Sequence, residues 1–316
     1  MKLFLYKILK FTSPLIVLTF FIIFFHKSIY KKPYFQKNRS DDLVEILKNN
    51  NKKNYNTLIL GNSRSQMLKA KNFNNNLKSE ETSFHFDNPG GNIYHFYHSL
   101  DYFLKNYNAK NIILFLDGQS LKFNDTEFAY HTSLSPKISG NYLKFYFNYF
   151  KLFYNYKMIV SIILKESNID LPDYFKGFIL ETLDYSQTDF ETGDITFNID
   201  ELIEINKDSI YESSIFEKRF QNNYQYKKFD KKISENFLKK FKILLSKNDL
   251  NFIVIIPPVY LNNSTSNEDI NMIKKVFDDK VFNFSIDSIM NNKYLFKDYS
   301  HFNEKFGNFI YKKIDL

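Results

Sequence analysis

Two short stretches at opposite ends of the chain contain the residue types of a Ser-His-Asp triad. Ser63 is the third residue of the sequence GNSRS at 61–65, directly after the apolar run 57–60. Asp298 precedes His301 by three residues, which is close enough for the carboxylate to orient the imidazole ring from the same loop. In such a triad the serine attacks an ester carbonyl, the histidine takes its proton and the aspartate stabilises the imidazolium. We predict Ser63, Asp298 and His301 as catalytic residues.

Each half of this pair also has an ordinary structural explanation. A Gly-x-Ser turn after a strand is common, and Ser65 stands where the Gly-x-Ser-x-Gly elbow of α/β-hydrolases has its second glycine. A histidine in a loop near the C-terminus is usually only solvated. The catalytic interpretation therefore depends on the two motifs occurring together.

The segment around Ser63 predicts a strand followed by a helix. Residues 57–60 read as a buried strand that ends in a glycine turn, and a helix is expected over 63–71. This places the hydroxyl of Ser63 at a helix N-terminus, where free N–H groups and the helix dipole stabilise negative charge.

Strands and helices alternate through most of the remaining chain, which predicts an α/β fold with a parallel sheet. Ligand sites in such sheets gather at the carboxyl ends of the strands, and Ser63, Gly90, Asp117 and the loop 298–301 follow such ends. The further strands are expected at 83–87, 111–116, 251–256 and 281–285, and the further helices at 94–106, 231–247, 268–277 and 303–314.

The N-terminal region predicts a membrane anchor. The apolar run 11–25 is extended by residues 3–8 if Lys7 and Lys10 reach the interface, and no small-residue cleavage site follows it. The net charge is +8, but residues 1–40 hold eight of the 43 basic residues and no acid, so the other 35 basic residues balance the 35 acidic ones. This balance argues against a nucleic-acid partner.

We expect residues 1–32 to be a single-pass transmembrane signal anchor in a bacterial membrane and 33–55 to be a polar stalk. The catalytic domain is expected over 56–316, with a mostly helical insertion at about 119–230. Within this insertion an aromatic helix is predicted at 141–165 and a hairpin around 191–194. The basic residues on both sides of the anchor favour a cytoplasmic domain slightly, whereas the signal-like order of the N-terminus favours export. We expect the catalytic domain to be extracytoplasmic.

The other histidines do not predict a metal site. His95 and His98 are three residues apart, but no His-Glu-x-x-His pattern completes them, and an amphipathic helix explains both. His85 in a strand and His131 in the insertion are predicted to be structural. The chain has no cysteine, so thiolate chemistry is excluded, and no cofactor is expected.

These motifs together resemble the SGNH (GDSL-like) hydrolase superfamily. The sequence at 61–65 is similar to its first block, with Asn62 in place of the usual Asp, and residues 298–303 with Gly307 resemble its last block. The second block is represented by Gly90 or Gly91. The resemblance implies a flavodoxin-like three-layer sandwich around the parallel sheet, and an oxyanion hole formed by the backbone amides of Ser63 and of Gly90 or Gly91.

One position departs from this pattern. The third block of the superfamily supplies an Asn side chain to the oxyanion hole, whereas Asp117 follows the third strand here. An ionised carboxylate cannot donate a hydrogen bond, so Asn92 or Gln119 must substitute or the donor is missing. Asp117 is expected either to cap its loop or to bind a sugar hydroxyl. Arg64, Asp117 and Gln119 are the candidate substrate-binding residues.

The resemblance, with the N-terminal anchor, implies a membrane-anchored serine acyltransferase or esterase. Its substrate would be the O-acyl groups of a cell-surface polysaccharide, and its partners that glycan and an acyl donor or membrane acyl carrier. The alternative is a non-catalytic protein of the same fold that binds polysaccharide or scaffolds its assembly complex. A cytoplasm-facing lipid esterase is a third possibility, which rests only on the flanking charges.

Overall fold

The computed structural model separates into two units, one of residues 1–37 and 143–183 and the other of residues 38–142 and 184–316. All elements that position the candidate site belong to the second unit. The structure describes residues 39–74, 81–122, 134–145, 147, 186–197, 231–260, 265–298 and 300–314, with residues 4, 6–8, 10–14, 17, 164, 169, 205, 206, 211 and 212.

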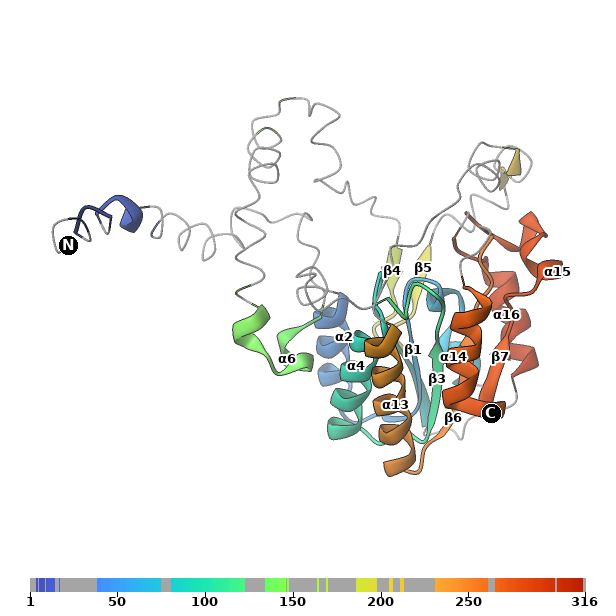
Figure 1. Cartoon of the computed structure of the whole chain (residues 1–316). Helices are drawn as coiled ribbons and strands as arrows, with labels where there is room; N and C mark the ends of the chain where they lie inside the picture. Colours follow the sequence, from blue (N-terminus) through green and yellow to red (C-terminus); the bar gives the residue numbers. More distant parts are fainter. Residues whose placement is uncertain are drawn as a thin grey trace. The chain divides into compact units, whose positions relative to one another are not determined.

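A five-stranded parallel sheet in the order β2-β1-β3-β6-β7 forms the centre of the second unit, which confirms the α/β prediction (Figure 1). Because β1 lies between β2 and β3, the chain leaves β1 first to one side and later to the other. A crevice at the carboxyl ends of the strands is expected at such a switch point. The strands are β1 (Asn54–Gly61), β2 (Glu81–Asp87), β3 (Asn111–Phe115), β6 (Asn251–Ile256) and β7 (Val281–Asn283).

Helices cover both faces of this sheet, because the side chains of each central strand alternate between two apolar clusters. Leu58 and Leu60 of β1 belong to one cluster and Ile59 to the other, and all three are fully buried. Figure 1 shows α2, α4 and α13 together on one side of the sheet and α16 on the other. The first cluster includes α2 (Arg39–Asn49), α4 (Ile93–Asn106), α13 (Lys231–Lys247) and α14 (Asn267–Phe277), and the second η1 (Ser65–Met67), α3 (Ala70–Asn74) and α16 (Glu304–Lys313).

Residues 39–49, predicted as part of the stalk, instead form α2 within the domain. Leu43, Val44 and Leu47 are fully buried in the first cluster, because they recur on one face of the helix. The second unit accordingly starts at Asn38 rather than at residue 56.

The continuous helix predicted over 63–71 is also absent. The chain forms the single 3-10 turn η1, becomes extended at Leu68 and resumes as α3. Gly307 of α16 approaches this turn so closely that an added Cβ would lie 2.0 Å from the Met67 carbonyl oxygen. Ser63 therefore precedes a short turn and not a full helix, so the helix-dipole argument does not apply to it.

The predicted hairpin is confirmed as the antiparallel pair β4 (Ser186–Thr188) and β5 (Ile195–Phe197). Its loop covers the free edge of β2, where the His85 amide donates to the Thr192 carbonyl at 2.8 Å. The remaining short elements are α6 (Pro136–Ser139), η3 (Asp278–Lys280), α15 (Asp287–Met290) and η4 (Lys293–Leu295).

Two predictions for the anchor and the insertion lie largely outside the described residues. These are the apolar run 11–25 and the aromatic helix at 141–165. Within the described part of the chain, no helix has both the length and the apolar character needed to cross a membrane.

Candidate active site

The turn after β1 presents Ser63 at the carboxyl end of the sheet. Ser63 is partly exposed, while its neighbours Asn62 and Arg64 are buried. The Asn62 side chain holds the turn from within, because its Oδ1 accepts from the Arg64 amide at 3.0 Å and its Nδ2 donates to Asp117 Oδ2 at 3.2 Å. Asn62 is thus a structural residue of the turn that carries Ser63.

The loop that carries Asp298 and His301 is closed at its base by two buried aromatic residues. Phe296 and Phe302 form a β-bridge and are fully buried in the second apolar cluster. The carboxylate of Asp298 holds the loop together, because its Oδ1 accepts from the amides of Ser300 at 2.7 Å and of His301 at 2.9 Å. The loop is therefore anchored in the core at both ends and ordered by its own acidic residue.

The structure brings Ser63, His301 and Asp298 into one hydrogen-bonded chain, although 238 positions separate the serine from the histidine. His301 Nε2 lies 2.8 Å from Ser63 Oγ, and His301 Nδ1 lies 2.8 Å from Asp298 Oδ2. With Nδ1 donating to the carboxylate, Nε2 is the acceptor for the hydroxyl proton. This is the geometry that a general base needs in order to activate a serine nucleophile.

The charge of Asp298 is stabilised within this arrangement. Burial opposes its ionisation, but the hydrogen bonds and charge of His301, with the amides of Ser300 and His301, lower the pKa of Asp298 to about 2. The group is therefore a carboxylate at neutral pH. It can hold the imidazole in one tautomer and stabilise the imidazolium that forms during proton transfer.

Arg64 connects the two halves of the triad. Its Nε donates to the Ser300 carbonyl oxygen at 2.9 Å, and its Nη2 donates to Gln119 Oε1 at 3.1 Å. Its Nη1 forms an ion pair with Asp117, whose side chain is 1% exposed. The planar guanidinium thus joins the Ser63 turn, the loop after β3 and the loop of Asp298 and His301.

Asp117 does not take the place of an oxyanion donor. Burial opposes its ionisation, but the charge of Arg64 and hydrogen bonds from Ser120 and Asn62 lower its pKa. Its Oδ1 accepts from the amide of Ser120 at 2.7 Å and from the hydroxyl of Ser120 at 2.9 Å. Arg64 and Asp117, predicted to bind substrate, are thus buried against one another, and of that predicted set only Gln119 is exposed.

Two of the four predicted oxyanion donors are already engaged. The Gly91 amide donates to the Asn88 carbonyl at 2.7 Å, and Asn92 caps α4 while its Nδ2 donates to the Lys122 carbonyl at 3.0 Å. Among the described residues, no acceptor engages the amides of Ser63 and Gly90. Gly90 is exposed and has a positive φ of 70°, which favours glycine.

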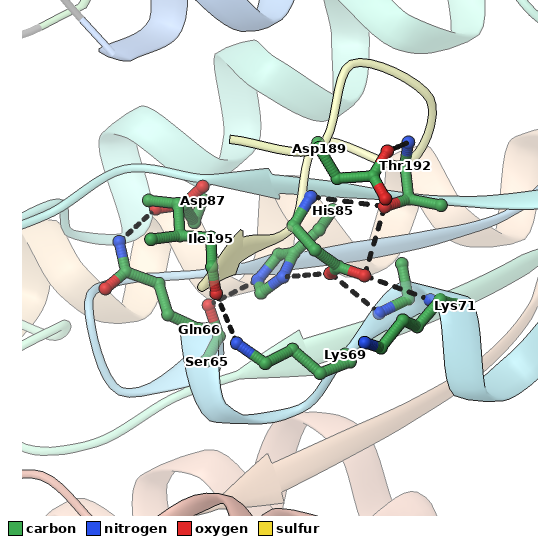
Figure 2. Close-up of polar contacts among 12 residues, drawn as sticks. Ser65, Gln66, Lys69, Lys71, His85, Asp87, Asp189, Thr192 and Ile195 are labelled. Atoms are coloured by element: carbon green, nitrogen blue, oxygen red, sulfur yellow. Dashed lines mark hydrogen bonds and ion pairs between the residues drawn. The ribbon is translucent and has the colours of Figure 1, made fainter. Parts of the chain in front are cut away.

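A second Ser-His-Asp chain, which the sequence did not reveal, lies buried beneath the turn. Ser65 Oγ is 2.9 Å from His85 Nε2, and His85 Nδ1 is 3.3 Å from Asp194 Oδ1. Figure 2 shows Ser65 next to the His85 ring and the hairpin residue Thr192 next to the His85 backbone. The alternation Phe84-His85-Phe86-Asp87 was a usable signal, because it puts two polar side chains on one face of β2.

The other histidines have structural roles where they are described. The amide of Asn92 donates to His95 Nδ1 at 3.0 Å, and the His98 ring packs edge-on against Tyr94. His131 lies outside the described residues. Across the described ranges, no cluster of three or more histidine or acidic side chains is arranged to hold a metal ion.

Comparison with known proteins does not assign the chain. No protein-family model matches it, and no curated protein is significantly similar to it.

Proposed function

We propose that this protein is a membrane-anchored serine acyltransferase or esterase of SGNH type, acting on O-acyl groups, chiefly acetyl, of a cell-surface polysaccharide. The observation that carries the proposal is the hydrogen-bonded chain Ser63–His301–Asp298 at the carboxyl end of a parallel sheet. The strand order, with β1 between β2 and β3, supports a flavodoxin-like arrangement for the domain.

The reaction proceeds in two steps through an acyl-serine. Ser63 Oγ forms a bond to the acyl carbon of an ester donor while its proton moves to His301 Nε2. The donor C–O bond then breaks, and the departing oxygen takes that proton. In the second step a hydroxyl gives its proton to His301, its oxygen takes the acyl group, and the proton returns to Ser63. A sugar hydroxyl makes this step a transfer, and water makes it a hydrolysis.

We favour transfer to a sugar hydroxyl. The long insertion between β3 and α13 offers material for a glycan-binding surface that would exclude water from the acyl-serine. The N-terminal apolar run would anchor the enzyme at the membrane, where an acyl carrier would deliver the donor.

Turnover of a chromogenic acetyl ester by the full-length protein tests this proposal. We expect turnover that Ser63→Ala abolishes and that oligosaccharide acceptors accelerate, with acetylated sugar as the product. Ser246→Ala, which changes an exposed serine of α13, is the matched control and should keep wild-type turnover. Hydrolysis that no acceptor alters would contradict transfer, and undiminished turnover by Ser63→Ala would contradict the enzyme.

A non-catalytic role in polysaccharide binding or assembly is the second candidate. The engagement of the Gly91 amide and the Asn92 side chain favours it, as does the ion pair of Asp117 with Arg64, because these three groups are not left to bind an oxyanion. In a cell that depends on this protein for surface polysaccharide, a scaffold would keep its phenotype with Ser63→Ala. An enzyme would lose it.

A further inference from the structure

The peptide group between Asn62 and Ser63 is held from one side by Ser65. The Asn62 carbonyl oxygen accepts from the Ser65 amide at 3.0 Å and from Ser65 Oγ at 2.8 Å. Because a peptide group is planar and trans, its C=O and N–H point in opposite directions. Fixing the Asn62 carbonyl therefore fixes the direction of the Ser63 amide, one of the two unengaged oxyanion donors.

We propose that Ser65, His85 and Asp194 form a positioning chain that orients and polarises the Ser63 amide as an oxyanion donor. The inference rests on the proposed acyl-transfer function. It assigns these three residues to the same reaction without direct contact with the substrate. The chain extends inward from the turn and ends at Asp194, in the loop between β4 and β5.

The hydrogen-bond inventory sets the direction of the chain. An ionised carboxylate only accepts, so His85 Nδ1 donates to Asp194. His85 Nε2 lies 2.9 Å from Ser65 Oγ, and Ser65 Oγ donates to the Asn62 carbonyl at 2.8 Å. The chain therefore runs from Asp194 through His85 and Ser65 to the Asn62 carbonyl.

Asp194 is held firmly in place at the inner end of this chain. Its Oδ1 accepts from the Ala70 amide at 2.8 Å, and its Oδ2 accepts from the Lys71 amide at 3.0 Å and from Thr192 Oγ1 at 3.1 Å. Burial opposes the ionisation of Asp194, but His85 and the two amides lower its pKa.

Burial makes this chain effective. Ser65 and His85 are fully buried and Asp194 is 2% exposed, so water does not weaken the hydrogen bonds. Hydrogen bonds in series polarise one another in a low-dielectric interior. The hydrogen bond between His85 and Ser65, together with donation by Ser65 to the Asn62 carbonyl, increases the positive charge at the Ser63 N–H where an oxyanion would develop.

Gly61 provides the space for this arrangement. A Cβ at residue 61 would lie 2.5 Å from Ser65 Cβ and 2.7 Å from Ser65 Oγ. The absence of a side chain at Gly61 therefore leaves room for the Ser65 hydroxyl to reach the Asn62 carbonyl.

The kinetics of Ser65→Ala and His85→Gln in the full-length protein test the inference. With a chromogenic acetyl ester, we expect Ser65→Ala to lower kcat by about tenfold or more while KM changes less than about twofold, because only transition-state binding is lost. His85→Gln keeps a polar group next to Ser65, so its loss of kcat should be smaller than the loss in Ser65→Ala. Ser83→Ala is the matched control on β2, because the Ser83 hydroxyl is buried without a hydrogen-bond partner among the described residues.

The possible results separate this inference from the proposed function. A lower melting temperature of Ser65→Ala with wild-type kcat would overturn the inference and leave the enzyme intact. Equal losses of kcat in Ser65→Ala and Ser83→Ala would overturn it as well. Wild-type turnover by Ser63→Ala would overturn the proposed function itself and, with it, the role of the Ser63 amide.

Discussion

At the scale of single residues, the site depends on two acidic side chains, each paired with a basic one. Asp298 faces His301 in a partly exposed pair, Arg64 faces Asp117 in a buried ion pair, and each carboxylate also accepts several backbone or hydroxyl hydrogen bonds. Removing one member of the buried pair leaves the other unpaired in a poorly hydrated place, which is costlier than losing both. The two acidic residues therefore offer direct tests of the geometry.

Asp117→Asn should destabilise the fold strongly, because it leaves the Arg64 guanidinium buried without its counter-charge. We expect the free energy of unfolding, measured with urea, to fall by about 3 kcal/mol. The matched control is Asp101→Asn, which breaks an exposed pair with Lys105 on α4 and should cost less than about 1 kcal/mol. Similar losses in the two variants would show that the Arg64–Asp117 pair is not buried as described.

Asp298 should stabilise the fold in a pH-dependent way. Its pKa in the folded protein is about 2, below the ordinary value of 3.8, so its contribution to stability is present above about pH 4 and is lost as pH falls toward 2. The difference in melting temperature between wild type and Asp298→Asn should shrink across this interval. The carboxyl titrates between about pH 5 and about pH 2. A difference in melting temperature that stays constant across this range would contradict the pairing of Asp298 with His301.

At the scale of secondary structure, close backbone approaches position the nucleophile. The turn after β1 is held by β3, because a Cβ at Gly61 would lie 2.8 Å from Phe115 Cβ, and the following 3-10 turn is held by Gly307 of α16. The two glycines of the sequence motifs thus serve packing between elements. Neither has a positive φ, so steric contact and not backbone conformation requires glycine at these positions.

Gly61→Ala should therefore destabilise the protein and displace Ser65. We expect a loss of about 2 kcal/mol or more in the free energy of unfolding, as for overpacked cores. Adding Ser65→Gly should recover part of this loss, since it removes the Ser65 side-chain atoms that a Cβ at residue 61 would meet. Unchanged stability of Gly61→Ala in calorimetry would contradict the close approach.

The elements themselves were largely predictable from the sequence. The strand at 251–256 and the helix at 231–247 have the predicted bounds, because long apolar or amphipathic runs have a clear period. The helix over 63–71 was not predictable as it stands, because packing against α16 interrupts it. The chain from Ser65 through His85 to Asp194 was not predicted, because its members come from a turn, a strand and a hairpin loop. Asp194 lies 109 positions after His85.

At the scale of the whole molecule, the second unit draws its site from both ends of the sequence. The sheet brings the turn after β1 to the loop before α16, and Arg64 joins them across 236 positions. The insertion contributes two contacts to this scaffold. Asp194 of the hairpin accepts from the Ala70 amide just after the Ser63 turn. Tyr211 Oη donates to the Phe296 carbonyl at 2.9 Å, at the base of the loop that carries Asp298 and His301. The insertion is thus part of the scaffold that holds both halves of the triad.

For the whole chain, we expect the second unit to be exported from the cytoplasm. Alkaline phosphatase fused after Leu316 should be active in cells, because the proposed glycan substrate lies outside the cytoplasm. A fluorescent protein that matures only in the cytoplasm, fused at the same point, should stay dark. The opposite pair of results would place the domain in the cytoplasm and favour the lipid esterase.

The central claim is that Ser63 is a nucleophile activated by His301. Labelling of the full-length protein with a fluorophosphonate, followed by peptide mass spectrometry, tests it most directly, because this reagent forms a stable adduct with an activated serine. We expect one adduct, on Ser63, that is lost in His301→Ala and kept in Ser246→Ala. A wild-type protein that is folded but carries no adduct on Ser63 would contradict it.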